Sequence, residues 1–191
     1  MFSKISILIR TGKTVFSFNE ICLNWCETDY NRASVKIHYY VKKGELINIR
    51  NGLYALNENY DRLEAANKLY KPSYISLETV LFRNNIIFQY NSSIFLLSYL
   101  SREIIVNGDT YVYKKIKDTA LCNPLGIITG KYSIANTERA ILDSLYTYSE
   151  YYFDNLNTVN WDRLFEYSEI YERKNLKTKI DKLYKKHNKN A

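Results

Sequence analysis

The segment Ile47–Leu56, INIRNGLYAL, determines how the N-terminal third of the chain is interpreted. Its Asn-Gly pair lies between two short apolar runs, which is the strongest short-range sign of a β-hairpin with a two-residue type I′ turn. Pairing outward from that turn sets Arg50 opposite Leu53 and continues residue by residue to the ends of the hairpin. One face then carries four apolar side chains, namely Ile47, Ile49, Tyr54 and Leu56. Asn48 and Arg50 project from the other face, so helices can pack only on the apolar face.

Helices are predicted before this hairpin. The apolar spacing favours them over three ranges, 3–11, 19–25 and 30–43. Thr28 or Asp29 can cap the last of these helices, and Gly44 suits the left-handed position just beyond its end. A hairpin is marginally stable alone and becomes stable when helices cover its apolar face. The order of elements therefore predicts a winged helix-turn-helix, with the hairpin as the wing.

The segment 30–43 has two contrasting faces. When its residues are placed on a helix, five of them gather within about 120°, namely Tyr30, Ala33, Ile37, Tyr40 and Val41. The other side is polar and cationic and consists of Asn31, Arg32, Val35, Lys36, His38, Tyr39, Lys42 and Lys43. One face suits a protein core, and the other suits the major groove of B-DNA.

The polar side of this segment predicts DNA contacts of different kinds. Asn31 and Arg32 are candidates for base contacts, since Asn suits adenine and Arg suits guanine. Phosphate contacts orient a protein without specifying sequence, and four residues are placed for them: Lys36, Tyr39, Lys42 and Lys43. Arg50 on the wing can enter the minor groove or contact the backbone. His38 lies on the same side as these residues and completes the expected DNA-binding set.

Two other interpretations of this surface stay open, a solvated helix face and a module for protein–protein contact. The charge distribution favours DNA. The formal net charge is +7, and residues 1–56 hold eight Lys and Arg against four acids. Residues 57–171 hold eleven against fourteen, and residues 172–191 hold eight against two. Segregated positive charge is typical of proteins that meet phosphates.

The rest of the chain predicts a second, mixed domain. A helix is expected over 57–70, and Ser76 can cap the next helix. Short β-rich runs follow between residues 94 and 116, with a turn at 107–109. Helices resume within 134–153 and near Trp161. We therefore expect an α+β protein, with a winged helix-turn-helix over 1–57 and a mixed α/β C-terminal domain over 58–191 that ends in helices.

The C-terminal segment predicts an amphipathic helix. Its apolar seam consists of Leu176, Ile180, Leu183 and Tyr184, and lysines such as Lys174, Lys177, Lys182 and Lys185 lie opposite. A direct contact with nucleic acid is one interpretation of these lysines. Because charge runs on helix faces are common, we expect them to lie in water instead.

Several classes of protein are disfavoured by the composition. Cys22, Cys26 and Cys122 make an odd number of cysteines, so we expect free thiols and no metal site. The absence of a signal pattern or a long apolar run predicts a soluble, cytoplasmic protein without membrane contact. No Gly-rich phosphate loop or nucleophile with a paired base is present, so we expect neither an enzyme nor a cofactor.

Three blocks of sequence carry a resemblance to a known family. In chain order they are GELINIRNGLYAL at 44–56, PSYISLETVLFRNNII at 72–87 and IANTERAILDSLY at 134–146. Together they resemble the AbiEi antitoxins, which are bacterial transcriptional regulators of abortive-infection type IV toxin-antitoxin systems. The motif residues shared with that family are Ser76, Glu138, Arg139, Ala140 and Asp143, and we interpret them as residues that form the fold.

The resemblance implies a function for the whole chain. It implies an autorepressor that binds inverted repeats in its own promoter, as a monomer in solution and as two copies on DNA. It also implies an antitoxin for phage defence that counters a nucleotidyltransferase-like toxin without requiring a stable complex. The alternative is a stand-alone winged-helix regulator whose C-terminal domain serves dimerisation or ligand sensing.

Overall fold

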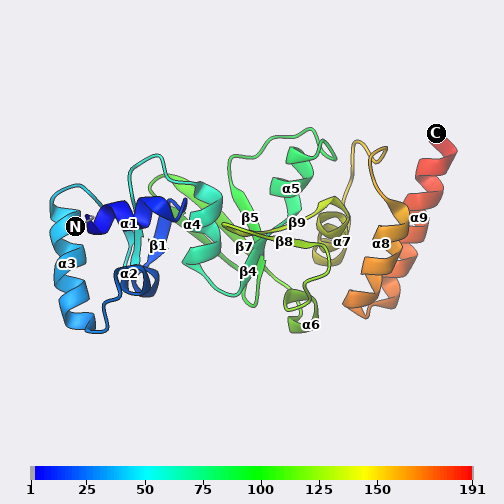
Figure 1. The fold of residues 1–191 in the computed structure, drawn as a ribbon. Helices are drawn as coiled ribbons and strands as arrows, with labels where there is room; N and C mark the ends of the chain where they lie inside the picture. The colour runs from blue at the N-terminus through cyan, green and yellow to red at the C-terminus, as the bar shows by residue number, and fades with distance from the viewer. Residues whose placement is uncertain (1–2, 191) are drawn as a thin grey trace. The chain divides into compact units, whose positions relative to one another are not determined.

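The computed structural model describes residues 3–190. The chain divides into two compact units (Figure 1). Unit 1 consists of Met1–Lys71 with Val106–Gly108, and unit 2 consists of Pro72–Ile105 with Asp109–Ala191. Each unit has its own β-sheet, so the chain is a mixed α+β protein as the sequence predicts.

Unit 1 alternates helices with very short strands. Its elements are α1 (Lys4–Arg10), β1 (Val15–Ser17), α2 (Phe18–Trp25), α3 (Tyr30–Lys42), β2 (Ile47–Arg50), β3 (Leu53–Ala55) and α4 (Arg62–Leu69). Helices were expected at the positions of α1, α2 and α3, and a hairpin at the position of β2 and β3. The strand β1 was not expected. It pairs antiparallel with β3, from Val15 opposite Ala55 to Ser17 opposite Leu53, so the hairpin belongs to a three-stranded sheet with the order β1-β3-β2.

The hairpin differs from its prediction in turn type and register. Arg50 does lie opposite Leu53, but a β-bulge follows, and Asn48 pairs with Tyr54. Gly52 has a φ of 77°, while Asn51 is absent from the described residues with positive φ, so the predicted type I′ turn is wrong. The bulge puts one extra residue, Ile49, into β2. The buried side chains of the hairpin are consequently Ile49, Leu53 and Ala55, while Ile47, Tyr54 and Leu56 are only partly buried.

The three helices α1, α2 and α3 and the sheet enclose one apolar core. Its buried members are Leu8, Phe16, Ile21, Trp25, Ile37 and Leu46. The start of α2 is fixed by a capping box, in which Ser17 and Glu20 each bond the other's backbone N–H. Trp25 adds a long-range tie, since its indole Nε1 donates to the Lys4 carbonyl at 2.8 Å. From α3, Ile37 joins this core, and Tyr40 and Val41 pack against it, so one face of α3 is held by unit 1.

The helix α4 belongs to unit 1, which therefore extends past residue 57. The reason is a buried polar cluster beneath β1. Glu64 accepts hydrogen bonds from the backbone N–H and the hydroxyl of Thr14, both at 2.8 Å. Lys68 donates to the Val15 carbonyl and lies 3.1 Å from carboxylate oxygens of both Glu64 and Glu20. Within α4, Ala66 is buried, whereas Leu63 and Leu69 are only partly buried.

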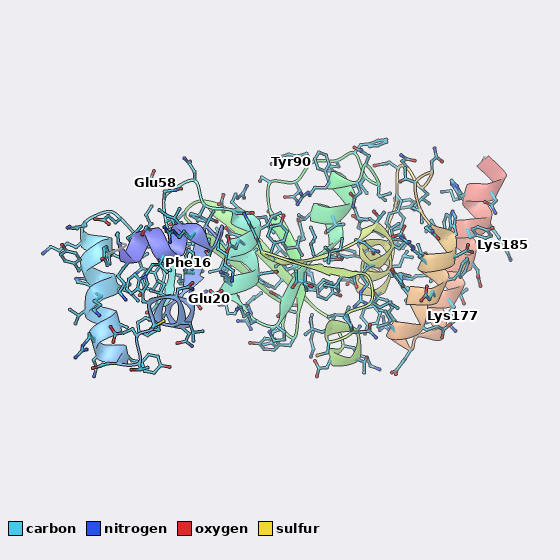
Figure 2. All side chains as sticks on the ribbon, viewed as in Figure 1. Phe16, Glu20, Glu58, Tyr90, Lys177 and Lys185 are labelled. Carbon is cyan, nitrogen blue, oxygen red and sulfur yellow. The ribbon has the colours of Figure 1, made fainter. Side chains whose placement is uncertain are left out.

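The carboxylate of Glu20, labelled in Figure 2, joins this cluster through Lys68. Burial alone would raise the pKa of Glu20. The Ser17 N–H and the Lys68 ammonium outweigh burial and lower that pKa to about 2. Glu20 therefore remains charged at pH values well above 2. Its ion pair with Lys68 links α2 to α4.

Unit 2 is built on a six-stranded mixed sheet with the order β6-β7-β5-β4-β9-β8. Its strands are β4 (Ser73–Ile75), β5 (Ile94–Ser98), β6 (Arg102–Val106), β7 (Asp109–Lys115), β8 (Ile127–Thr129) and β9 (Ser133–Ala135). Its helices are α5 (Leu77–Arg83), α6 (Asp118–Leu121), α7 (Thr137–Thr147), α8 (Trp161–Ser168), the 3₁₀ turn η1 (Glu169–Tyr171) and α9 (Lys174–Asn190). Figure 1 shows α8 and α9 side by side, and they are in contact. The β-rich middle and the helical end agree with the sequence prediction.

Three of the motif residues, Ser76, Arg139 and Asp143, form a buried polar cluster in unit 2. Arg139 and Asp143 are both fully buried, and Nε of Arg139 lies 3.4 Å from Oδ1 of Asp143. Asp143 also accepts hydrogen bonds from Tyr74 at 3.0 Å and from Tyr171 at 2.5 Å. Ser76 precedes α5 but makes no side-chain cap there. Its hydroxyl instead donates to Asp143 at 2.7 Å, so the predicted capping role is wrong, although the residues do hold the fold together.

Two observations concern membranes and metals. Within residues 3–190, none of the helices combines the length and the apolar character needed to cross a bilayer. Among the described residues, no group of three or more His, Cys, Asp and Glu side chains is arranged to hold a metal ion. Cys22 is buried in α2, whereas Cys26 and Cys122 are exposed, and all three are free thiols.

Candidate nucleic-acid interface

The helix α3 is defined by clear signals at both ends. Asp29 caps its start, and the Asp29 carboxylate accepts from the backbone N–H groups of Asn31 at 2.9 Å and Arg32 at 3.1 Å. After its end, Gly44 has a φ of 73°, and the Glu45 N–H returns to the Tyr40 carbonyl at 2.9 Å. The prediction of Asp29 and Gly44 as boundary residues is confirmed.

The inward face of α3 packs on the core of unit 1. Ala33 and Ile37 are buried, and Tyr40 and Val41 are partly buried against the core cluster. Tyr30 differs from the prediction, since 63% of it is exposed. The first turn of α3 extends beyond the core, and the Tyr30 ring instead stacks on Phe18, with centroids 5.9 Å apart.

The outward face of α3 is formed by the polar and cationic side predicted from sequence. Its exposed residues are Asn31, Arg32, Ser34, Val35, His38, Tyr39 and Lys42, followed by Lys43. Val35 lies roughly 180° around an ideal helix from the midpoint of Ala33 and Ile37. It is 72% exposed. An apolar β-branched residue therefore occupies the centre of a face whose neighbours are donors and cations, a feature that charge counting alone does not reveal.

Lys36 lies at the edge of this face and is already paired. Its ammonium donates to the carboxylate of Glu27 in the turn before α3, and Lys36 is only partly exposed. The hydrogen bond from Lys36 lowers the pKa of Glu27. A phosphate contact by Lys36 would have to share the ammonium with Glu27, so this residue is less available than its position in the sequence suggests.

Lys43 and Tyr39 form a second prearranged pair. The Lys43 ammonium lies 4.8 Å from the centroid of the Tyr39 ring and 3.8 Å from a carboxylate oxygen of Glu45. Both Lys43 and Tyr39 remain exposed. The cation is held over the aromatic ring without being withdrawn from solvent. Lys42 and His38 are exposed on the same helix.

Arg50 is held by a residue that sequence reasoning did not select. Its Nη1 donates to the hydroxyl of Tyr70 at 3.0 Å, and its guanidinium carbon lies 5.3 Å from the centroid of the same ring. Tyr70 follows α4 directly. Arg50 is exposed on β2, and Tyr70 restricts the rotamers that the arginine can adopt. No sequence signal links these residues, because only the packing of α4 in unit 1 brings them together.

The structure thus places six of the eight expected residues on α3 and Lys43 directly after its end, whereas Arg50 lies separately on the hairpin. The sequence matches no protein-family model, and a search of curated proteins returns no match. The function must therefore be inferred from these side chains.

Proposed function

We propose that unit 1 is a winged helix-turn-helix that binds double-stranded DNA, and that the chain represses transcription from its own promoter. In this proposal α3 is the recognition helix, and β2 with β3 forms the wing. The element order, helix, strand, helix, helix and hairpin, supports this assignment, as does the pairing of β1 with β3. A recognition helix lies in the major groove with its outward residues against base edges.

One observation supports the function most directly, the composition of the outward face of α3. A solvated helix face needs no exposed valine at its centre. On a face that binds DNA, an exposed valine can contact the methyl group that thymine presents in the major groove. Val35 in this role is flanked by Asn31 and Arg32, which suit adenine and guanine, and by Lys42, which suits a phosphate.

The remaining residues have supporting roles in the proposal. Tyr39 and Lys43 contact the DNA backbone as a pair, and His38 faces the groove wall. Lys36 contacts phosphate while Glu27 restricts its position. Arg50 contacts the backbone or the minor groove from the wing, with its guanidinium oriented by Tyr70.

The test is binding of the whole chain to the DNA upstream of its own gene, measured by fluorescence anisotropy against a scrambled duplex. Arg32→Ala should weaken specific binding by about 1–3 kcal/mol and reduce sequence preference. Lys42→Ala should weaken binding to both duplexes about equally. Lys131→Ala is the control, because Lys131 is an exposed lysine of unit 2. The proposal fails if Arg32→Ala and Lys42→Ala both bind the promoter like the unchanged chain and the Lys131→Ala control.

We further propose that the chain acts as the antitoxin of a type IV system and counters a nucleotidyltransferase-like toxin. This part rests on the resemblance of residues 44–56, 72–87 and 134–146 to the AbiEi antitoxins. Growth of cells that express the neighbouring toxin gene tests it. The full chain should restore growth, and the chain carrying Arg32→Ala with Lys42→Ala should still restore it if neutralisation is separate from DNA binding. A failure of the unchanged chain to restore growth would leave a regulator without antitoxin activity.

A further inference from the structure

Unit 2 contains an open cavity of about 480 Å³ between the segment that follows α7 and the helix α9. Its volume falls within the roughly 300–1,000 Å³ of typical small-molecule sites. Aromatic and apolar side chains line one side, and cationic side chains of α9 line the other. None of these residues belongs to unit 1, so the cavity is independent of the proposed DNA contact.

The aromatic wall is fixed in place. Tyr151 stacks on Tyr148 with ring centroids 5.3 Å apart, and Phe153 lies 5.0 Å from Tyr151. Just beyond them, the backbone N–H groups of Asp154 and Asn155 both donate to the Ile86 carbonyl, at 2.9 and 3.1 Å. The rings of this wall are therefore packed on one another, on a backbone that is anchored to the loop after α5.

The cationic wall is anchored as well. The Lys179 ammonium donates to the carbonyls of Leu145 and Tyr148, at 2.8 Å each. These carbonyls lie at the C-terminal end of α7, where a cation is favourable. Lys179 therefore fixes α9 against α7, and its charge is already committed to the fold.

Lys182 and Lys186 line the same cavity but, unlike Lys179, are not bonded to the part of the fold that the structure describes. They lie one helical turn apart on α9 and therefore on one face. Both are exposed, and among the side chains that the structure describes neither has a hydrogen-bond or ion-pair partner. By contrast, Lys177 of the same helix pairs with Glu169 at 2.6 Å. Two unpaired ammonium groups thus face an aromatic surface across a cavity.

Two carboxylates also line the cavity, those of Asp154 and Glu150, and the three lysines Lys179, Lys182 and Lys186 outnumber them. Asp154 accepts from the Phe88 N–H at 2.7 Å, so its carboxylate is turned toward the loop after α5. Glu150 is exposed and lines both this cavity and a neighbouring one. A free carboxylate at the rim is a suitable acceptor for sugar hydroxyls.

We propose that this cavity binds a nucleoside triphosphate, with its base against Tyr151 and Phe153 and its phosphates against Lys182 and Lys186. Stacking of a base on an aromatic ring is tolerant of base identity, and lysine binds phosphate as a point charge. The ribose hydroxyls lie toward Glu150. This ligand goes beyond the proposed DNA binding and gives unit 2 a small-molecule site of its own.

The experiment is isothermal titration of the full-length chain with ATP and with UTP. Adenosine and inorganic triphosphate serve as half-ligands. Saturable binding of ATP or UTP at one site per chain, weakened about tenfold or more by Lys182→Gln with Lys186→Gln, is the expected result. Lys185→Gln is the matched control, because Lys185 lies on the same helix outside the cavity lining (Figure 2).

A second variant tests the aromatic wall. Phe153→Leu keeps apolar volume and removes one ring face, so it should weaken nucleotide binding about tenfold and leave binding of inorganic triphosphate unchanged. Circular dichroism verifies that both variants are folded. The proposal is overturned if neither nucleotide binds, or if inorganic triphosphate binds as tightly as ATP. It is equally overturned if Arg32→Ala with Lys42→Ala removes nucleotide binding while the α9 variants keep it, because the nucleotide would then occupy unit 1.

Discussion

The two basic helices of this chain, α3 in unit 1 and α9 in unit 2, look alike in sequence and differ in structure. Each buries an isoleucine in the core of its own unit, Ile37 at 1% and Ile180 at 0% exposure. Each also carries several lysines on its other side. A helical wheel therefore gives both the same description, an amphipathic helix with a cationic face.

The difference lies in what surrounds the cations. On and just after α3 they surround the exposed Val35. Lys36 is paired with Glu27, and Lys43 lies over the ring of Tyr39. On α9, the Lys179 ammonium donates hydrogen bonds to carbonyls at the C-terminal end of α7, and Lys182 and Lys186 line a cavity. The comparison teaches that the number of lysines on a helix says little about its ligand. The shape and the partners of the face decide which ligand fits.

The largest effect should come from removing the buried isoleucine of each helix. Ile37→Ala and Ile180→Ala should each destabilise their unit by about 2–5 kcal/mol, from lost burial and the cavity left behind. Thermal unfolding followed by circular dichroism measures this cost. If the two helices serve separate ligands, Ile37→Ala should impair DNA binding and Ile180→Ala should impair ATP binding. A loss of both activities in either variant would show that the units are coupled.

The salt dependence of DNA binding should separate the two helices next. If about five phosphates are neutralised, log affinity should fall with log salt concentration at a slope near −4.5, at ~0.9 for each contact. Lys42→Ala should make that slope shallower by about 0.9. Lys185→Ala should leave it unchanged. Anisotropy titrations over a range of salt concentrations measure the slope, and an equal change in both variants would remove the distinction between the helices.

Val35 should have a smaller effect that is specific to thymine. Replacing thymine by deoxyuridine in the promoter deletes only the C5-methyl group. At the contacted position this should cost about 0.8 kcal/mol, the value of one buried methylene-sized group. The same replacement should cost little in the Val35→Ala chain, since the partner of the methyl group is gone. A double-mutant cycle gives the coupling, and additive losses at every thymine would exclude this contact.

The smallest effect should come from Tyr70. Tyr70→Phe removes the hydroxyl that accepts a hydrogen bond from Arg50 Nη1, and it keeps the ring beside the guanidinium. Promoter affinity should fall by about 0.5–1.5 kcal/mol at most, the usual net value of one hydrogen bond. The same substitution in an Arg50→Ala chain should change nothing. A full effect in that background would mean that Tyr70 acts without Arg50.

Local signals predicted much of unit 1. The boundaries of α3 follow from Asp29 and Gly44, and the pair Arg50 and Leu53 follows from the Asn-Gly turn. These features depend on residues close together in the chain. The strand β1 has only three residues, too few to show alternation, so sequence could not reveal the third strand. The bulge at Ile49 was missed because it depends on how β3 packs between its neighbours.

The parts of the candidate site that were missed depend on long-range contacts. Tyr70 reaches Arg50 because Glu64 and Lys68 attach α4 to Thr14 and Val15. Such a contact spans segments with no common pattern. The lysines of α9 were expected to lie in water, and Lys177, Lys182 and Lys185 are exposed. Nothing in the sequence, however, places Lys182 in one cavity with Tyr151 and Phe153.

The central claim is that the outward face of α3, and not basic charge in general, binds DNA. The most direct test compares two full-length variants that each lose two positive charges, Arg32→Ala with Lys42→Ala on α3 and Lys182→Ala with Lys185→Ala on α9. The dissociation constant for promoter DNA is measured for both at one salt concentration. The α3 variant should bind at least about tenfold more weakly, and the α9 variant should match the unchanged chain. Equal weakening of both, or weakening of the α9 variant alone, would contradict the account.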